Sequence, residues 1–391
     1  MLLINMFNLR LSNRPILVFI LFTLSISLIP SCSKSKKSKL PACTSENLFT
    51  EPAVPLTAIS HLDVIGSLAP VGGSPLPKSH TAYLMNTLNV PVTASGAFTI
   101  SRISVTTYVA SPTRQGFTDH SLSFDVCAEV SGDYAHISTL SEELSGQFNA
   151  DANCSEYNTV DETIRTCGSE VNIKVTAGTP LGVTATAAHT QNLDIGMRDS
   201  RLVDYANPSR YMDDGRGALC PWDFFIPSVK ASLYPLISGT GTPPATESPE
   251  CGTMAVDVAG TAKGRWTPQA NPADGSDPTS GDFFVLVSNP NFPESEIAIS
   301  TRIAALNTSS LSTFPVDLSS RLNVNPSDIT ANGTIYCYDE NLASSTYSYF
   351  VQLISAGNLR VEKFDHLAGS SICNTAPTSW AFTSSAIDLI R

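Results

Sequence analysis

Any acid–base or zinc chemistry in this 391-residue chain must draw on only six histidines: His61, His80, His120, His136, His189 and His366. The sequence lacks the short signatures of common enzymes, namely HExxH, GxSxG, the phosphate-binding P-loop and a GxGxxG leading into a helix. No cysteine and histidine spacing indicates a zinc knuckle. Candidate site residues must therefore come from segments far apart in the sequence.

Three segments carry such residues in a suggestive order. The first two each contain a histidine, His80 and His136. The segments are residues 65–83, residues 132–137, and residues 175–182 with 192–196.

Together these segments resemble the lysostaphin-like zinc endopeptidases, whose β fold is often called a duplicated hybrid motif. That family has a His-x-x-x-Asp metal motif, a Tyr-x-His-Leu strand, and a Gly-x-x-(Ile/Leu)-Gly turn before His-Leu-His. The resemblance covers roughly residues 58–205, about two fifths of the chain. It implies a β domain whose ligands are cell-wall peptides.

The resemblance assigns roles residue by residue. His80 falls at the first zinc-ligand position, but Leu84 stands where the ligand aspartate belongs. His136 matches the strand histidine that assists catalysis, and Asn192 and Asp194 replace the two histidines of His-Leu-His. His189, three residues before Asn192, is a further possible metal ligand.

The substitutions predict a degenerate catalytic site. A hydrolytic zinc needs about three protein ligands and an open position, whereas the family pattern supplies His80 and Asp194 alone. Asn192 cannot act as a base. We therefore expect a binding or structural module without a cofactor. The alternative is an active zinc endopeptidase in which His80, His136 and Asp194 converge on one metal, with His189 as a possible fourth group.

The first 31 residues are typical of an export signal. Arg10 and Arg14 precede an apolar run, residues 16–29, that is too short to span a bilayer as a helix. Ser31-Cys32 then resembles a lipobox, so Cys32 is the predicted lipidation site, followed by a lysine- and serine-rich tether. The alternative is an ordinary signal peptide with a cysteine nearby. The prediction is a lipoprotein anchored at the cell envelope, in the outer membrane.

Eight cysteines remain beyond Cys32, and an even set in an exported chain indicates disulfides. Proximity in the sequence favours three pairs and leaves the fourth by remainder. The predicted pairs are Cys154–Cys167, Cys220–Cys251, Cys337–Cys373 and Cys43–Cys127.

Composition excludes one class of partner. The net charge is −12, and no basic patch is interleaved with aromatic residues. Nucleic acid is therefore not an expected partner. The low charged fraction, 15%, with many glycines and prolines, favours short strands joined by tight turns.

Alternating residues predict a mainly β protein with two domains. The second would be a β-sandwich or barrel-like domain whose aromatic residues, Trp266 and Trp380 among them, could form a binding face. That is a third possibility, a surface adhesin; aromatic residues at alternating strand positions more often fill a core. Residues 138–148 are a plausible helix. The expected boundaries are 1–31 (signal peptide), 32–54 (lipidated cysteine and tether), 55–237 (lysostaphin-like domain), 238–250 (linker or loop) and 251–391 (C-terminal domain).

Overall fold

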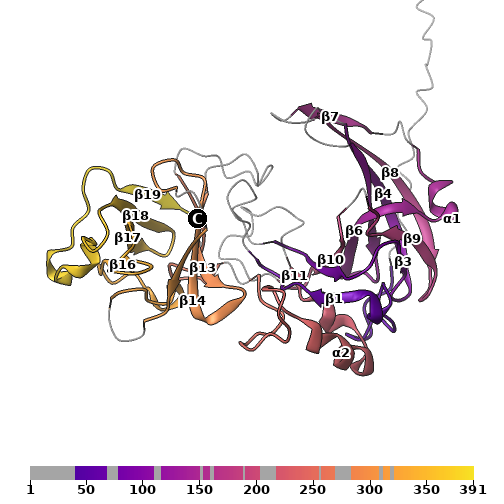
Figure 1. The fold of residues 1–391 in the computed structure, drawn as a ribbon, viewed down its shortest axis with the longest axis horizontal. Helices are drawn as coiled ribbons and strands as arrows, with labels where there is room; N and C mark the ends of the chain where they lie inside the picture. Colours follow the sequence, from indigo (N-terminus) through magenta and orange to yellow (C-terminus); the bar gives the residue numbers. More distant parts are fainter. Residues whose placement is uncertain are drawn as a thin grey trace, which may run out of the picture. The chain divides into compact units, whose positions relative to one another are not determined.

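Antiparallel strands make up most of the ordered chain, as the alternating pattern predicts (Figure 1). The computed structural model describes residues 40–67, 78–109, 116–149, 153–158, 163–187, 190–202, 217–254, 257–268, 283–307, 311–317 and 321–391. The predicted signal peptide, Cys32 and His189 lie outside the described residues. No helix among those residues is long and apolar enough to cross a membrane.

The first sheet follows the order β1-β2-β10-β6-β5-β4-β8-β7, with β11 beside β10 and with β9 between β3 and β6. Its strands are β1 (Ile59–Leu62), β2 (Thr81–Met85), β3 (Val90–Thr93), β4 (Phe98–Tyr108), β5 (Phe117–Asp125), β6 (Val130–Leu140), β7 (Ser155–Asn158), β8 (Thr163–Val175), β9 (Pro180–Thr184), β10 (Asn192–Asp199) and β11 (Ala218–Leu219). Strands distant in the sequence, β2, β10 and β6, are therefore direct neighbours. This arrangement matters because the candidate site residues lie on or beside these strands.

The helix predicted at residues 138–148 is wrong for most of its length. β6 continues to Leu140, and the helix α1 spans only Glu142–Ser145, with the Ser141 hydroxyl accepting a hydrogen bond from the Leu144 backbone N–H. Leu140 and Leu144 are both buried, so their spacing of four did reflect burial. The two leucines lie at the end of a strand and in a one-turn helix, because Ser141 between them is still extended, with a ψ of 157°, and caps the helix that begins at Glu142.

The first core packs against one face of this sheet. Its largest fully buried side chains include Tyr83, Tyr134, Trp222 and Phe225. Trp222 lies in a short 3-10 helix before α2 (Pro227–Leu233). Phe49, from the segment expected to be a tether, is also fully buried in this core and contacts Phe124 and Phe225. Ordered structure therefore begins before residue 55.

The second sheet is nearly closed and barrel-like, in the order β15-β14-β13-β12-β19-β18-β17-β16. Its strands are β12 (Gly264–Pro268), β13 (Phe284–Asn289), β14 (Phe292–Thr301), β15 (Ser312–Pro315), β16 (Tyr336–Tyr338), β17 (Tyr347–Ser355), β18 (Asn358–Asp365) and β19 (Ile387–Ile390). Trp266, Tyr338 and Tyr349 are fully buried, and Trp380 is 8% exposed. Trp266, Tyr338 and Tyr349 belong to the main core of this sheet, and Trp380 packs in a smaller cluster with Phe350 and the Cys337–Cys373 disulfide, so these aromatic side chains do not form an exposed binding face.

All four predicted disulfides are confirmed: Cys43–Cys127, Cys154–Cys167, Cys220–Cys251 and Cys337–Cys373. Such a set is typical of a protein that folds in an oxidising compartment outside the cytoplasm. The two sheets have separate hydrophobic cores. Residues Leu40–Arg391 nevertheless form one compact unit. The division into two domains near residue 240 stays a prediction.

Candidate functional site

Four side chains from four places in the sequence meet on one face of the first sheet. His80 precedes β2, Asp119 lies on β5, His136 on β6 and Asp194 on β10. The Nε2 atoms of His80 and His136 lie 3.3 and 3.2 Å from the same oxygen, Oδ2 of Asp194. His136 Nδ1 lies 2.8 Å from Asp119 Oδ2. The result is a continuous chain of groups, Asp119–His136–Asp194–His80.

Strand register explains how these residues come together. β10 lies between β2 and β6, and Asp194 is directly opposite Ala82 on one side and Ala135 on the other. Residues directly opposite in antiparallel strands have neighbouring side chains on the same face. Two small alanines therefore flank the carboxylate and leave room for the imidazoles of His80 and His136.

A β-bulge directs the side chain of His136. β5 pairs with β6 through His120–Ile137 and then Leu122–Tyr134, so two residues of β6, Ala135 and His136, oppose one residue of β5. This count defines a β-bulge, a feature that re-aims side chains and is frequent beside active sites. His136 has a φ of 67°, in the left-handed region that non-glycine residues seldom adopt.

The two carboxylates determine the protonation of His136. Burial alone would lower the pKa of His136, but the hydrogen bonds and negative charges of Asp119 and Asp194 outweigh it and raise the pKa to about 10. Burial would raise the pKa of Asp194, but His136 and His80 hold it well below its usual range. At neutral pH without a metal, His136 is therefore an imidazolium between two carboxylates.

Asn192 and Leu84, which stand at two substituted positions of the motif resemblance, are cross-strand partners in the register of β10 and β2. The Asn192 amide nitrogen, Nδ2, donates to Asp194 Oδ1 at 2.6 Å. Asn192 therefore fixes the carboxylate and leaves Oδ2 facing the two histidines. Leu84 supplies no ligand atom to the site.

The donor types of the cluster suit zinc. Two imidazole nitrogens and one carboxylate oxygen are a known ligand combination of hydrolytic zinc sites. Zinc bonds of roughly 2.0–2.1 Å in tetrahedral geometry place two ligand atoms about 3.3 Å apart. The separations of 3.3 and 3.2 Å between Asp194 Oδ2 and the two histidine nitrogens match this spacing. Among the described residues, however, His80, His136 and Asp194 do not form a group whose ligand atoms all lie within 4.8 Å of one another, so the two imidazoles would have to move closer to share one ion. Asp119 would orient the His136 ring through the hydrogen bond at Nδ1, as carboxylates beyond the ligand shell do for zinc-bound histidines.

Two acidic residues of this region were not predicted from the sequence. Asp119 is 9% exposed and contacts His136 directly. The Asp63 backbone N–H donates to Ala82, which places Asp63 in the same cross-sheet row as Asp194. Burial raises the pKa of Asp63, although the Val64 N–H and Lys78 act in the opposite direction. The sequence places Asp119 in the strand-like run Thr118-Asp119-His120 but gives it no signal that separates it from other polar strand residues.

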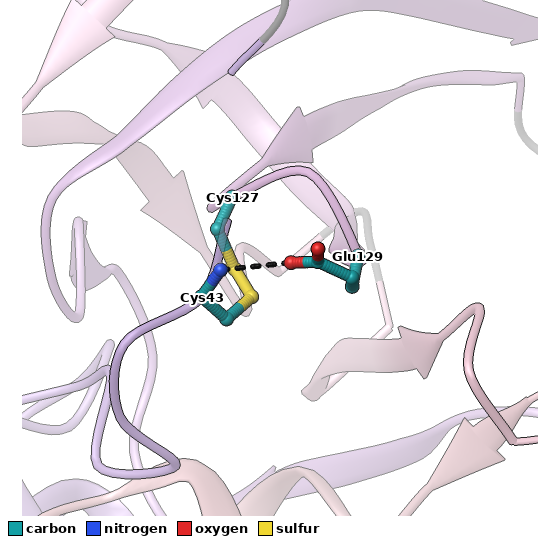
Figure 2. Close-up of side chains that lie close together, drawn as sticks. All are labelled: Cys43, Cys127 and Glu129. Carbon is teal, nitrogen blue, oxygen red and sulfur yellow. Dashed lines mark hydrogen bonds between the residues drawn. A yellow bond between two sulfur atoms is a disulfide. The ribbon is translucent and has the colours of Figure 1, made fainter. Parts of the chain in front are cut away.

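Cys43, Cys127 and Glu129 also lie close together, but this group is structural. The two sulfurs form a disulfide and so are not free thiolates, and the Cys43 backbone N–H donates to Glu129 Oε2 at 2.8 Å (Figure 2). A bonded disulfide is a poor metal ligand because the thiolate is the binding form. The group fastens residues 40–43 to the turn between β5 and β6.

Taken together, these features define a mainly β, disulfide-bonded protein with a histidine and carboxylate cluster on its first sheet. No family model and no curated protein sequence matches the chain. Among solved structures, the chain is similar to the solution structure of lysostaphin, with a TM-score of 0.25 and 12% sequence identity. The alignment covers 88% of this chain and 92% of lysostaphin. At that TM-score the similarity does not establish a shared fold.

Proposed function

We propose that this protein is an exported lipoprotein, tethered to the cell envelope, whose first sheet carries a catalytically degenerate peptidase-like site that binds cell-wall or surface peptides. The ligand class follows from the lysostaphin-like motif order in the sequence. The lipid anchor follows from Ser31-Cys32, and the four disulfides are consistent with a location outside the cytoplasm.

The observation that carries the proposal is the state of His136. A general base needs a free lone pair and a pKa near the working pH. His136 has carboxylates at both ring nitrogens and a pKa of about 10, so it holds its proton at neutral pH. Asn192, at the other catalytic position of the family, is an amide and cannot accept one. Neither family position therefore supplies a base.

The test compares the natural chain with a variant that carries two residues of the family pattern. Residues 40–391, produced in an oxidising compartment, are mixed with purified peptidoglycan, and co-sedimentation and release of soluble fragments are measured with added zinc. We expect binding with no chelator-sensitive release. The double variant Leu84→Asp, Asn192→His returns two family residues to the site and is expected to hold zinc more tightly. Chelator-sensitive cleavage by the natural chain would refute degeneracy, and the absence of binding would refute the ligand class.

A second candidate, a zinc endopeptidase with a rearranged site, is favoured by the convergence of His80, His136 and Asp194. Zinc bound there would supply a Lewis acid for a peptide carbonyl. Imidazole must be neutral to bind a metal, so loading would require His136 to release its proton. Asp119 would then hold the ring orientation through Nδ1.

Metal content separates the two candidates. The purified protein is assayed for bound zinc by mass spectrometry beside His80→Ala, with His61→Ala as a control that removes a histidine outside the cluster. About one zinc per chain, lost only in His80→Ala, would favour the peptidase and justify a substrate screen. A folded protein that takes up no zinc under supplementation would eliminate it.

A further inference from the structure

Thr184, the last residue of β9, makes two side-chain contacts with the backbone of the site. Its side chain is fully buried. The hydroxyl, Oγ1, lies 2.6 Å from the carbonyl oxygen of His136 and 3.1 Å from the carbonyl oxygen of Asn192. One hydroxyl proton is thus shared between the backbones of β6 and β10, at the two residues that occupy the catalytic positions of the family.

The bulge explains how the His136 carbonyl comes to face Thr184. β9 pairs with β6 through Ile137–Thr184, and the register then shifts before Thr139–Val183. The left-handed conformation of His136 turns its carbonyl away from the direction it would have in a regular strand. This contact is part-buried, and backbone carbonyls withdrawn from water are nearly always hydrogen-bonded. The Thr184 hydroxyl provides that bond from the neighbouring strand.

We infer that Thr184 is a positioning residue of the site: its hydroxyl holds the His136 and Asn192 carbonyls and so aims the His136 imidazole between Asp119 and Asp194. The inference adds to the proposed function a residue that controls the geometry of the same site. It concerns the metal-free protein and is independent of whether peptide or zinc binds.

The side chain of Thr184 suits this role in two ways. Threonine is β-branched and favoured in strands, so its rotamer is restricted and its hydroxyl direction is well defined. Valine has nearly the same shape without the hydroxyl, and serine keeps the hydroxyl without the methyl group. The pair Thr184→Val and Thr184→Ser therefore separates hydrogen bonding from packing.

The experiment observes the imidazole of His136 by ¹⁵N–¹H NMR in metal-free residues 40–391, at a pH near 7. The Nδ1–H proton, which is hydrogen-bonded to Asp119 in the natural chain, is assigned by its loss in His136→Gln. We expect Thr184→Val to accelerate exchange of this proton with solvent at least tenfold and Thr184→Ser to leave the rate within about twofold. Thr106→Val is the matched control, because it removes a hydroxyl bonded to Thr166 elsewhere on the same sheet.

A folded Thr184→Val protein with unchanged exchange at His136 would overturn the inference. If Thr184→Val does not fold, Thr184→Ala removes the hydroxyl without adding bulk, and the same exchange measurement decides. Equal acceleration in Thr106→Val would also contradict it, because the effect would then be a general loosening of the sheet. Failure to bind peptidoglycan would refute the proposed function but would not affect the exchange result for Thr184.

Discussion

Replacing Asp119 with asparagine removes one of the two carboxylates that hold the His136 imidazolium. The change keeps the size of the side chain and deletes its charge. Asp119 lies 2.8 Å from Nδ1, the distance of a strong charge-assisted hydrogen bond. Such bonds contribute roughly 1.5–3 kcal/mol, so we expect Asp119→Asn to lower the free energy of unfolding by about that amount at pH 6.

The cost of Asp119→Asn in free energy of unfolding should decrease as the pH rises. The folded-state pKa of His136, about 10, lies above the value of 6.5 expected in the unfolded chain. Its contribution to stability is therefore complete below pH 6.5 and is lost as the pH rises through 10. At 1.36 kcal/mol per pKa unit the loss is at most about 5 kcal/mol in the natural protein. Asp119→Asn lowers the folded-state pKa, so the difference between the two proteins shrinks toward about 1 kcal/mol near pH 10.

Urea unfolding of both proteins, measured at half-unit steps from pH 5 to 10, tests this. Asp133→Asn is the control, because Asp133 pairs at 2.6 Å with Arg198, whose charge does not change over this range. The cost of the control substitution should stay level across the same range. A cost of Asp119→Asn that is also constant with pH would refute the claim that His136 is an imidazolium held by two carboxylates.

Further predictions concern the C-terminal sheet and the disulfides. The Arg391 guanidinium donates to four backbone carbonyls and lies 4.3 Å from the Trp266 ring centroid, so Arg391→Ala should cost roughly 2–4 kcal/mol in urea unfolding, with Arg391→Lys recovering only part. Replacing both cysteines of Cys337–Cys373 by serine should cost about 4 kcal/mol, and the same change at Cys154–Cys167 about 3 kcal/mol, because the closed loops span 36 and 13 residues. Equal losses from the two double variants would contradict the loop-entropy argument.

Much of the fold could be predicted because strand alternation and cysteine spacing are local patterns of the sequence. Period-two alternation at residues 98–105 and 171–175 indicates the strands Phe98–Tyr108 and Thr163–Val175. Once Cys32 is set aside, sequence proximity indicates three of the disulfides and leaves Cys43–Cys127 as the fourth. The apolar residues at 254–258 also predict a strand, yet the described residues of this run lie outside any strand. A short apolar run does not identify a strand without a partner, and pairing is a property of the tertiary structure.

The candidate site was only partly accessible from the sequence. Motif order indicated His80, His136 and Asp194, and whether they meet depended on β10 lying between β2 and β6. Asp119 could not be distinguished from any polar residue of a half-buried strand, because only the bulge at His136 turns the imidazole toward it. Positive φ at a histidine has no sequence signature of its own.

The disulfide Cys43–Cys127 also determines how a pull on the N-terminal end of the ordered chain would pass into the body. The bond closes a covalent loop with a sequence separation of 84 residues, which contains β1 to β5. Tension applied before Cys43 would cross directly to Cys127 and enter the sheet at the start of β6. The strands inside the loop would carry almost none of it. The envelope tether of the proposed function could therefore be strained without peeling away the first strands, and the load would fall first on the strand that carries His136.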